Sequence, residues 1–418
     1  MTEPRSGAGA APAPRPGGPL PSLSIRPLWS QVYLPNLIIA TGQGAMIPVL
    51  VYAARQVHAS PAEAVIVVAL NGLGTMFFDL PAGRLTARFG ELRSAQLAAA
   101  MLVGGLVGCV LASSFLMLAC FVALQAAGWA LWSLVRLVHL SRVASPEVRG
   151  RALSVFGGVI RAGNVIGPFV FVAVSTRSDA RASFVIYLIG VVAGVAWLLA
   201  ARDGKDQEGK RGRAERARPV KILIDHRRSF ATAGLGVFAI SLLRGSRTAI
   251  VPLWAAHIGL DAKSAAAIFA FSSVIDLALF YPAGVMSDRF GRRAVVLPCL
   301  ALLSVGHILV PFSHTYLTLF YAAFILGFGN GFGSGIVMTL GADLTPVVGR
   351  ASFLAVWRLV SDGGTSAGPL LDSAIVGLGA IALVGPVVGV VGLAVTVVVA
   401  VWLEEPAPNR RDGRRERL

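Results

Sequence analysis

The chain alternates long apolar runs with short polar connections. Each apolar run has about 20 residues, which is the length that a helix needs to cross the hydrocarbon core of a bilayer. The twelve runs that we predict to be spanning helices are 33–54, 64–84, 94–113, 115–138, 152–175, 183–201, 231–256, 264–286, 294–313, 315–341, 351–377 and 380–403. The pattern therefore predicts an all-α membrane protein with twelve transmembrane helices.

The overall composition agrees with this pattern. Hydrophobic residues make up 55% of the 418 residues and charged residues only 14%, and the mean hydropathy is +0.72. About a quarter of the residues in a soluble protein are charged, so a soluble fold is excluded and the lipid bilayer is the expected surrounding.

The formal net charge of +16 raises the possibility of nucleic-acid binding, which the positions of the basic residues argue against. Most Lys and Arg residues fall in the tails and in the even-numbered connections, whereas Arg55, Arg177, Arg181 and Lys263 fall in the odd-numbered ones. Basic residues concentrate on the cytoplasmic side of membrane proteins. We therefore expect a multi-pass protein of the cell membrane, with both termini cytoplasmic and no nucleic-acid partner.

Polar stretches divide the chain into five segments. Residues 1–30 form a Pro/Gly/Ala-rich segment without the apolar core of a signal peptide, and we expect a disordered cytoplasmic tail. Residues 31–201 and 230–403 are expected to form two six-helix bundles. A basic cytoplasmic linker, 202–229, joins them, and a second cytoplasmic tail, 404–418, follows.

A charged turn and its partial copy show that the two halves are repeats. The turn reads Gly284-Val-Met-Ser-Asp288-Arg289-Phe-Gly291-Arg292-Arg293, and the copy lies 201 positions earlier, where Arg88-Phe89-Gly90 corresponds to Arg289-Phe290-Gly291. A second repeated element is Gly163-x-x-x-Gly167-Pro168 in the fifth run and Gly364-x-x-x-Gly368-Pro369 in the eleventh. We infer two six-helix pseudo-repeats around a central site.

The charged turn resembles the signature that major facilitator superfamily (MFS) transporters carry between their second and third helices and again between the eighth and ninth. This resemblance implies the MFS fold, alternating access and a gating role for Gly284, Asp288, Arg289, Gly291 and Arg292. We expect Asp288 to accept backbone N–H groups at a helix start and Arg292 to pair with Asp343. In the first half, Ala87 stands at the position of Asp288, and Val143 or Ala144 stands at the position of Asp343. We therefore expect the first half to lack the ion-pair latch that Arg292 and Asp343 form.

Charged residues inside the predicted spans are candidates for proton coupling, because an unpaired charge in the bilayer is costly. In the family the second helix abuts the eleventh and the fifth abuts the eighth. We therefore expect Arg161 to pair with Asp276 and Arg358 to pair with Asp79 across the two halves, and we expect Asp276 or Asp362 to take up the coupling proton. A purely structural role for each pair remains an alternative.

The Gly-x-x-x-Gly-Pro elements allow close approach of neighbouring helices, and the proline bends the helix. The copy in the fifth run resembles a motif associated with drug:proton antiporters of the family, although the Gly-Gly that usually follows is replaced by Phe169-Val170. The resemblance implies efflux.

Substrate contacts are expected from the first, fourth, seventh and tenth helices, which line the central cavity in this family. Aromatic side chains with a few polar groups suit a bulky, partly apolar ligand, although tryptophan also marks bilayer interfaces. The candidates are Gln43, Trp129, Trp132, Arg247, Trp254 and Asn330. Alternating glycines from Gly327 to Gly335 predict a soft tenth helix, suited to close packing or to a gating hinge.

Enzyme chemistry is not indicated. Gly364-Thr-Ser366-Ala-Gly368 fits the nucleophile-elbow pattern but lies inside an apolar run rather than at a strand-to-helix turn. Neither a zinc-protease nor a phosphate-binding motif occurs, and Cys109, Cys120, Cys299 and His307 are expected to be packed within spans. We expect no catalytic residue, metal or cofactor.

These observations predict a monomeric secondary transporter that exports a small lipophilic or drug-like molecule in exchange for protons. Two alternatives remain open at this point: proton-coupled uptake of a small metabolite or organic anion, and a non-transporting receptor or assembly protein on the same fold.

Overall fold

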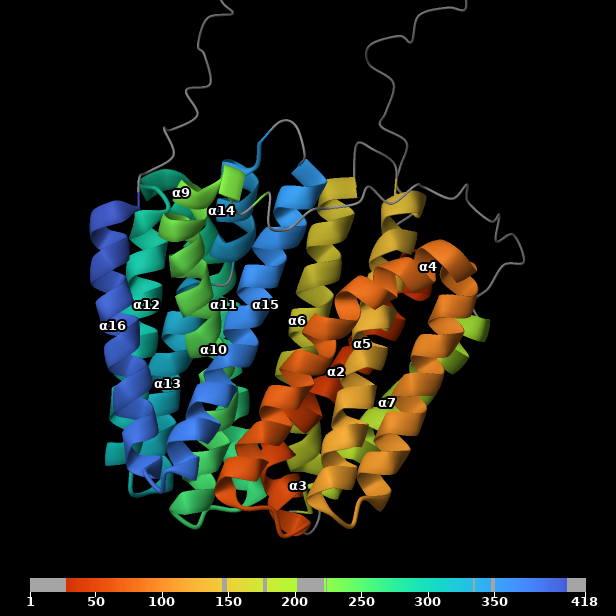
Figure 1. Ribbon diagram of the computed structural model, residues 1–418. Coiled ribbons are helices and arrows are strands. Elements are labelled where there is room, and N and C mark those ends of the chain that lie inside the picture. Colours follow the sequence, from red (N-terminus) through yellow and green to blue (C-terminus); the bar gives the residue numbers. More distant parts are fainter. Residues whose placement is uncertain are drawn as a thin grey trace, which may run out of the picture.

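The computed structural model describes residues 28–144, 149–175, 179–200, 222, 224–333, 335–346 and 350–403. Every regular element within these ranges is a helix, and the long helices run roughly parallel to one another (Figure 1). Residues 1–27 of the first predicted tail, the second tail 404–418 and most of the linker lie outside the described residues.

The first half comprises the helices before residue 201. Short π and 3₁₀ segments interrupt its first span, and its second and third spans form one element. Its elements are η1 (Trp29–Tyr33), α2 (Leu34–Met46), η2 (Ile47–Val49), α3 (Leu50–Gln56), α4 (Pro61–Leu111), α5 (Phe115–Val143), α6 (Arg149–Val174) and α7 (Arg181–Ala200).

The second half comprises the helices from residue 227 onward. Its elements are α9 (Arg227–Ser229), η3 (Phe230–Gly234), α10 (Leu235–His257), α11 (Ala262–Phe290), α12 (Arg293–Leu309), η4 (Val310–Phe312), α13 (Tyr316–Phe332), α14 (Ile336–Leu344), α15 (Arg350–Gly377), η5 (Ile381–Leu383) and α16 (Val384–Trp402). The predicted tenth span is thus two helices, α13 and α14, that meet in the glycine-rich segment.

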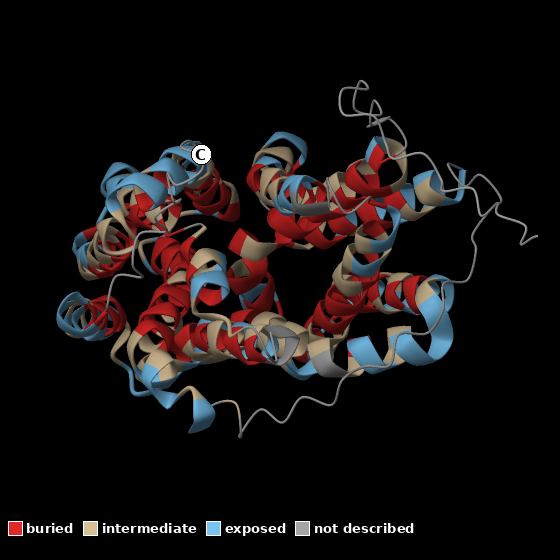
Figure 2. Cartoon of the chain, turned by 90° about the horizontal axis from the view of Figure 1, so that it is seen from above, coloured by how far each residue is buried: buried red, intermediate tan, exposed pale blue. Residues whose placement is uncertain are grey.

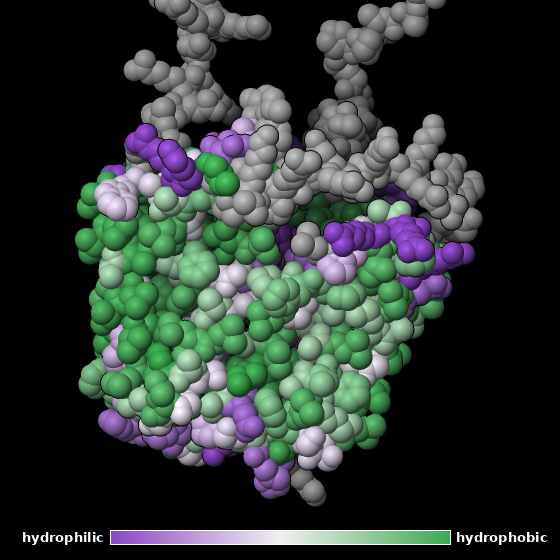
Figure 3. Space-filling model, viewed as in Figure 1, coloured by the Kyte–Doolittle hydropathy of each residue, from purple (hydrophilic) through white to green (hydrophobic). Residues whose placement is uncertain are grey.

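Eleven helices in the described ranges are long and apolar enough to cross a membrane. The twelfth predicted span, α15, has 28 residues but is not among them, since it carries Arg358, Asp362 and Asp372. Figure 3 shows an apolar belt around the side of the molecule, with hydrophilic residues toward its two ends. The predicted all-α membrane fold is confirmed.

Polar side chains start the helices at one end of the bundle. The hydroxyl of Ser60 accepts from the Glu63 amide, and the Glu63 carboxylate accepts from the Ser60 amide. Ser114 and Asp261 cap α5 and α11 in the same way. These caps satisfy amide groups that a helix start leaves unpaired. We call this end the distal end and the opposite end, which holds Leu28 and Leu403, the terminal end.

The two halves meet mainly along two helix pairs, α4 with α15 and α6 with α11, with smaller contacts of α3 and η2 to the second half. These are the two pairs that the sequence led us to expect. Figure 2 shows buried residues mainly on the inner sides of the helices and exposed residues mainly on the outer sides.

Hydrogen bonds join the halves at the distal end. The Tyr52 hydroxyl donates to the Leu260 carbonyl over 2.9 Å, and the Arg55 guanidinium donates to the Ala256 carbonyl over 3.2 Å. The hydroxyl of Ser373 on α15 donates to the carbonyl of Ala62 on α4 over 2.9 Å. The halves are therefore held closed at the distal end.

Candidate transport site

The charged turn of the second half is built around Arg292. Gly291 ends α11 at φ 91°, and Arg292 Nε then donates to Asp343 Oδ2 over 2.8 Å, while Nη1 donates to Asp288 Oδ1 over 2.8 Å and to Ser287 Oγ over 2.7 Å. Burial disfavours the charged guanidinium, but these hydrogen bonds outweigh it and raise the pKa of Arg292. The contact ties the α11–α12 turn to α14.

The contacts of three other residues in this turn differ from the expectation or do not involve Asp343. Asp288 accepts from Arg292 rather than from backbone N–H groups, because its exposed carboxylate lies one helical turn from that arginine. Gly284 has open space around it, and the Arg289 guanidinium lies over the Phe290 ring at 5.5 Å.

The expectation that the first half lacks this latch is wrong. Arg142 Nη2 donates to Glu91 Oε2 over 2.9 Å, and the His139 ring nitrogen Nδ1 lies 3.0 Å from the same oxygen. Glu91 stands 201 positions before Arg292, and Arg142 stands 201 positions before Asp343. Both halves therefore contain the ion pair, but the acid and the base have exchanged positions. A search for an acid at the counterpart of Asp343 does not find this pair.

The first ion pair between the halves joins α6 to α11. Arg161 Nη1 lies 3.4 Å from Asp276 Oδ1, and the Arg161 guanidinium also lies 4.9 Å from the centre of the Phe280 ring. The Asn330 amide on α13 donates to Asp276 Oδ2, and Arg244 on α10 donates to the Asn330 carbonyl over 3.2 Å. Side chains from α6 and α13 thus meet the Asp276 carboxylate of α11, and α10 is joined to this group through Asn330.

The second ion pair between the halves joins α4 to α15. Arg358 Nη2 lies 3.0 Å from Asp79 Oδ2, and Arg358 Nε lies 3.4 Å from Asp362 Oδ2. The Arg358 side chain is 54% exposed. One arginine therefore balances two carboxylates, one from each half, so breaking either contact leaves a carboxylate free to accept a proton.

The two Gly-x-x-x-Gly-Pro elements bring helix backbones together within each half. A Cβ added at Gly167 would lie 2.2 Å from the Thr41 carbonyl oxygen, and one added at Gly368 would lie 2.3 Å from the Leu242 carbonyl oxygen. Gly163 and Gly364 make similarly close approaches, and Pro168 and Pro369 lie inside α6 and α15. These elements position the helices that carry Arg161 and Arg358.

The predicted cavity residues are buried or bonded mainly within their own half. Trp132 donates to Asn36 over 3.0 Å beneath the Arg136 guanidinium, and Trp254 donates to the Ser313 carbonyl near the distal end over 2.8 Å. Gln43 and Trp129 are buried. Arg247 donates to Ser272 over 2.7 Å, so Asn330, bound to Asp276, is the candidate closest to the ion pairs.

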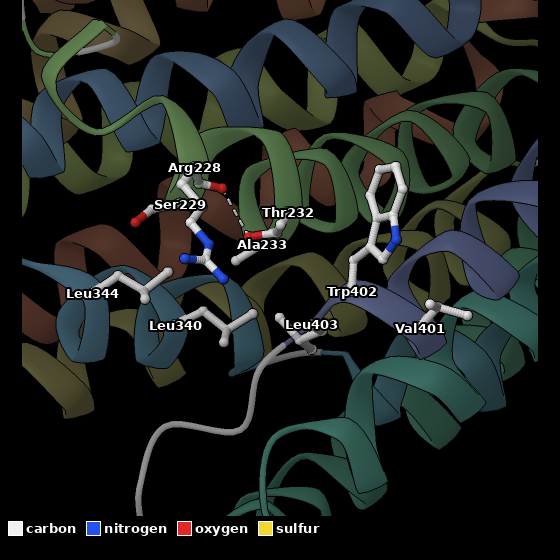
Figure 4. Close-up of a pocket in the computed structure, with 9 residues that line it drawn as sticks. All are labelled: Arg228, Ser229, Thr232, Ala233, Leu340, Leu344, Val401, Trp402 and Leu403. Carbon is white, nitrogen blue, oxygen red and sulfur yellow. Dashed lines mark hydrogen bonds between the residues drawn. The ribbon is translucent and has the colours of Figure 1, made fainter.

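A pocket of about 410 Å³ opens at the terminal end of the second half (Figure 4). It lies between α9, η3, α14 and the end of α16, and the Thr232 hydroxyl on its wall donates to the Arg228 carbonyl over 2.9 Å. All of its lining residues belong to the second half. It is therefore not a passage between the halves.

One buried acid was missed at the level of sequence. Asp372 on α15 is fully buried and bonded to Ser246 on α10. It lies inside the predicted eleventh span, so a complete count of acids in the spans would have found it. Its hydrogen-bond partner is a serine, which also contacts His307, rather than an arginine or lysine at a matching depth, and only the fold brings these residues together.

The family of the chain follows from its match to a family model. The Major Facilitator Superfamily model matches residues 32–243 and 233–418. The chain belongs to the major facilitator superfamily, and it is a transmembrane transporter rather than an enzyme.

Two curated relatives match shorter segments. A segment of 100 residues is 29% identical to the bacillibactin exporter of Bacillus subtilis (strain 168) and covers 23% of this chain and 25% of that protein. A segment of 92 residues is 32% identical to the arabinose-proton symporter of the same organism, and it covers 22% of this chain and 20% of that protein. The matches thus span a quarter or less of either relative.

A solved structure supports the fold over almost the whole chain. The crystal structure of a D-xylose-proton symporter aligns to this chain with a TM-score of 0.67. The alignment covers 92% of this chain and 98% of the symporter chain. The sequences are only 15% identical, so this likeness shows the fold alone.

Proposed function

We propose that this transporter exports a small, largely apolar molecule in exchange for protons. The observation that carries the proposal is the pair of ion pairs between the halves, Arg161–Asp276 and Arg358–Asp79, because only a change in the arrangement of the halves would break them. The Gly163-x-x-x-Gly167-Pro168 element and the segment similar to an exporter support the outward direction.

In this proposal proton uptake and helix movement are linked through the carboxylates. A proton on Asp276 removes the charge that attracts Arg161, so the halves separate more easily where that pair lies. A proton on Asp362 instead frees Arg358 from its neighbour on α15 and leaves it to Asp79 of the other half. Loss of the proton restores the ion pair. The Asn330 amide keeps Asp276 oriented in both conditions, since it can bond to a carboxylate or to a carboxylic acid.

A second candidate is proton-coupled transport of a small organic anion, including uptake of a metabolite. Arg161, Arg244 and Arg247 surround the single carboxylate of Asp276 and its partner Asn330. This excess of positive charge would attract an anionic substrate. The segment similar to the arabinose-proton symporter supports symport for this second candidate.

We further propose that both termini are cytoplasmic in the cell membrane and that the protein acts as a monomer. The distribution of Lys and Arg supports this orientation. The terminal end is then the cytoplasmic side, and the distal end, which is closed here, faces outward.

The test is proton flux in proteoliposomes of the full chain, with a pH-sensitive dye inside. Lipophilic cations, neutral antibiotics and organic anions are added outside, each with an imposed gradient. We expect a compound-dependent pH change that Asp276→Asn abolishes. Asp225→Asn, which removes an exposed carboxylate at the end of the linker, away from the charged turn and from the contacts between the halves, is the matched control and should keep the flux.

Two outcomes would contradict the proposal. Flux that persists in Asp276→Asn and in Asp362→Asn would exclude both carboxylates as the coupling group. Substrate movement without any pH change would exclude proton coupling, and a response to organic anions alone would favour the second candidate.

A further inference from the structure

Three polar side chains meet in the interior of the second half, among α10, α12 and α15. Ser246, His307 and Asp372 are each fully buried. Ser246 Oγ lies 2.9 Å from Asp372 Oδ1 and 3.2 Å from His307 Nε2, and His307 Nδ1 lies 2.7 Å from the Leu303 carbonyl oxygen. We call these three residues the Asp372 triad.

The hydrogen bonds of the triad require one more proton than a carboxylate and a neutral histidine provide. The Leu303 carbonyl can only accept, so His307 Nδ1 carries its hydrogen and Nε2 of the neutral ring accepts. With the extra proton on Asp372, the acid donates to Ser246 and the Ser246 hydroxyl donates to Nε2. With the extra proton on His307, Nε2 donates to Ser246 and Ser246 donates to Asp372, which places two charges in the interior and is therefore disfavoured. Without that proton, Ser246 has one hydrogen for two acceptors.

Burial also favours the neutral acid. Asp372 Oδ2 has no hydrogen-bond partner, so ionisation would place a charged oxygen in the interior without a donor, at a cost of several kcal/mol. A neutral acid leaves only a carbonyl oxygen there.

The charged and titratable groups on the helices packed against the triad have other environments. On α4, Glu63 is bonded to Ser60 and Asp79 to Arg358. On α10, Arg244 is bonded to Asn330 and Arg247 to Ser272. Asp276 on α11 is bonded to Arg161, Arg292 to Asp343, and Arg293 on α12 to the Leu403 carbonyl. His257 stacks on Trp254, and Lys263, Asp288 and Arg289 lie at the ends of α11. Asp362 on α15 itself lies against Arg358.

The first half supplies an internal comparison. An added Cβ at Gly368 would lie 2.5 Å from the Ser246 amide, and one at Gly167 would lie 2.4 Å from the Ala45 amide. The same offset of 201 positions relates Asp372 to Phe171 and His307 to Leu106. The counterparts Ala45, Leu106 and Phe171 are buried and apolar, so packing at this place in the fold does not require polar groups.

The triad lies directly behind the contact that closes the distal end. Ser373, the next residue after Asp372, donates to the Ala62 carbonyl of the other half. Any movement that separates α4 from α15 at the distal end would therefore bring water to the surface of α15 beside Asp372.

We propose that the Asp372 triad is a proton-binding site, which holds one proton on Asp372 while the distal end is closed and exchanges it with water on the distal side when the halves separate. This inference rests on the alternating access of the proposed function. It adds a site that is separate from both ion pairs between the halves.

Infrared difference spectroscopy of the purified full chain in nanodiscs tests the protonation. At neutral pH we expect a carbonyl-stretch band of a protonated carboxylic acid that Asp372→Asn removes and Asp362→Asn leaves unchanged. His307→Gln, a second variant that keeps the acid, should shift this band without removing it. A spectrum of Asp372→Asn that retains every protonated-acid band would overturn the proposal.

Deuterium exchange of that band tests access from the distal side. A Cβ added at Gly377 would lie 3.9 Å from the Ala62 Cβ, which suits a disulfide, so Ala62→Cys with Gly377→Cys can lock the distal end. We expect exchange to be at least about tenfold slower in the locked protein than after reduction, because exchange needs opening. Equal rates would overturn the proposal.

The two proposals fail separately. The Asp372 band could exchange only when the distal end can open, while transport causes no pH change. This result would contradict proton-coupled export but would support the Asp372 site. Proton-coupled transport without an Asp372 band would remove the site alone.

Discussion

At the scale of single residues, the backbone of the two charged turns explains their shared glycine. Gly90 has φ 80° and ψ 171°, and Gly291 has φ 91° and ψ 170°. Residues other than glycine are strongly disfavoured at these backbone angles. The same residue therefore ends a helix and turns the chain in both halves, which is why the arginine–phenylalanine–glycine sequence recurs.

Replacing this glycine should cost stability. We expect Gly291→Ala to lower the free energy of unfolding by about 1–3 kcal/mol, because alanine is strained at this φ. Gly284→Ala, in the same segment but inside α11 with open space around it, should be neutral or stabilising by up to about 1 kcal/mol. Thermal unfolding of both purified variants measures the difference, and equal melting temperatures would contradict the assignment.

The sequence allowed some residue contacts to be predicted and not others. Arg161 and Asp276 could be matched because opposite charges at one depth of a bilayer attract. Glu91 and Arg142 could not be matched by the family pattern, since their charges are exchanged. Asp372 has no arginine or lysine in its triad, so its environment follows only from the packing of three helices.

At the scale of elements, apolar run length predicted the helices and glycine positions predicted their irregularities. The second and third predicted spans form a single element, α4, interrupted only at Gly90. The alternating glycines of the tenth span mark the place where α13 ends at Phe332 and α14 begins at Ile336. What run length could not supply is which faces meet, because apolar residues surround these helices on most sides.

The α2–α6 contact provides a test at this scale. Gly167→Ala would place a methyl group 2.2 Å from the Thr41 carbonyl oxygen, which must push two backbones apart. We expect a loss of about 1–3 kcal/mol or more and less folded protein after extraction.

The matched control lies on the same helix. Gly157 has open space around it, so Gly157→Ala should fold as well as the wild type. Size-exclusion profiles and melting temperatures of the two variants give the comparison, and a Gly167→Ala protein as stable as Gly157→Ala would refute the close packing.

At the scale of the whole molecule, the two halves are joined by few polar contacts whose positions define one state. The Tyr52, Arg55 and Ser373 hydrogen bonds close the distal end, and the two ion pairs between the halves lie deeper in the bundle. The repeats and the even number of spans could be inferred from sequence. The closed arrangement of the distal end could not be inferred from the sequence, because the same contacts have to break during transport.

The measurement that tests alternating access most directly is transport by Ala62→Cys with Gly377→Cys in proteoliposomes, before and after reduction. The account predicts that the disulfide holds the distal end closed and stops transport, that reduction restores it, and that neither single substitution has this effect. Complete cross-linking with transport undiminished would contradict the account.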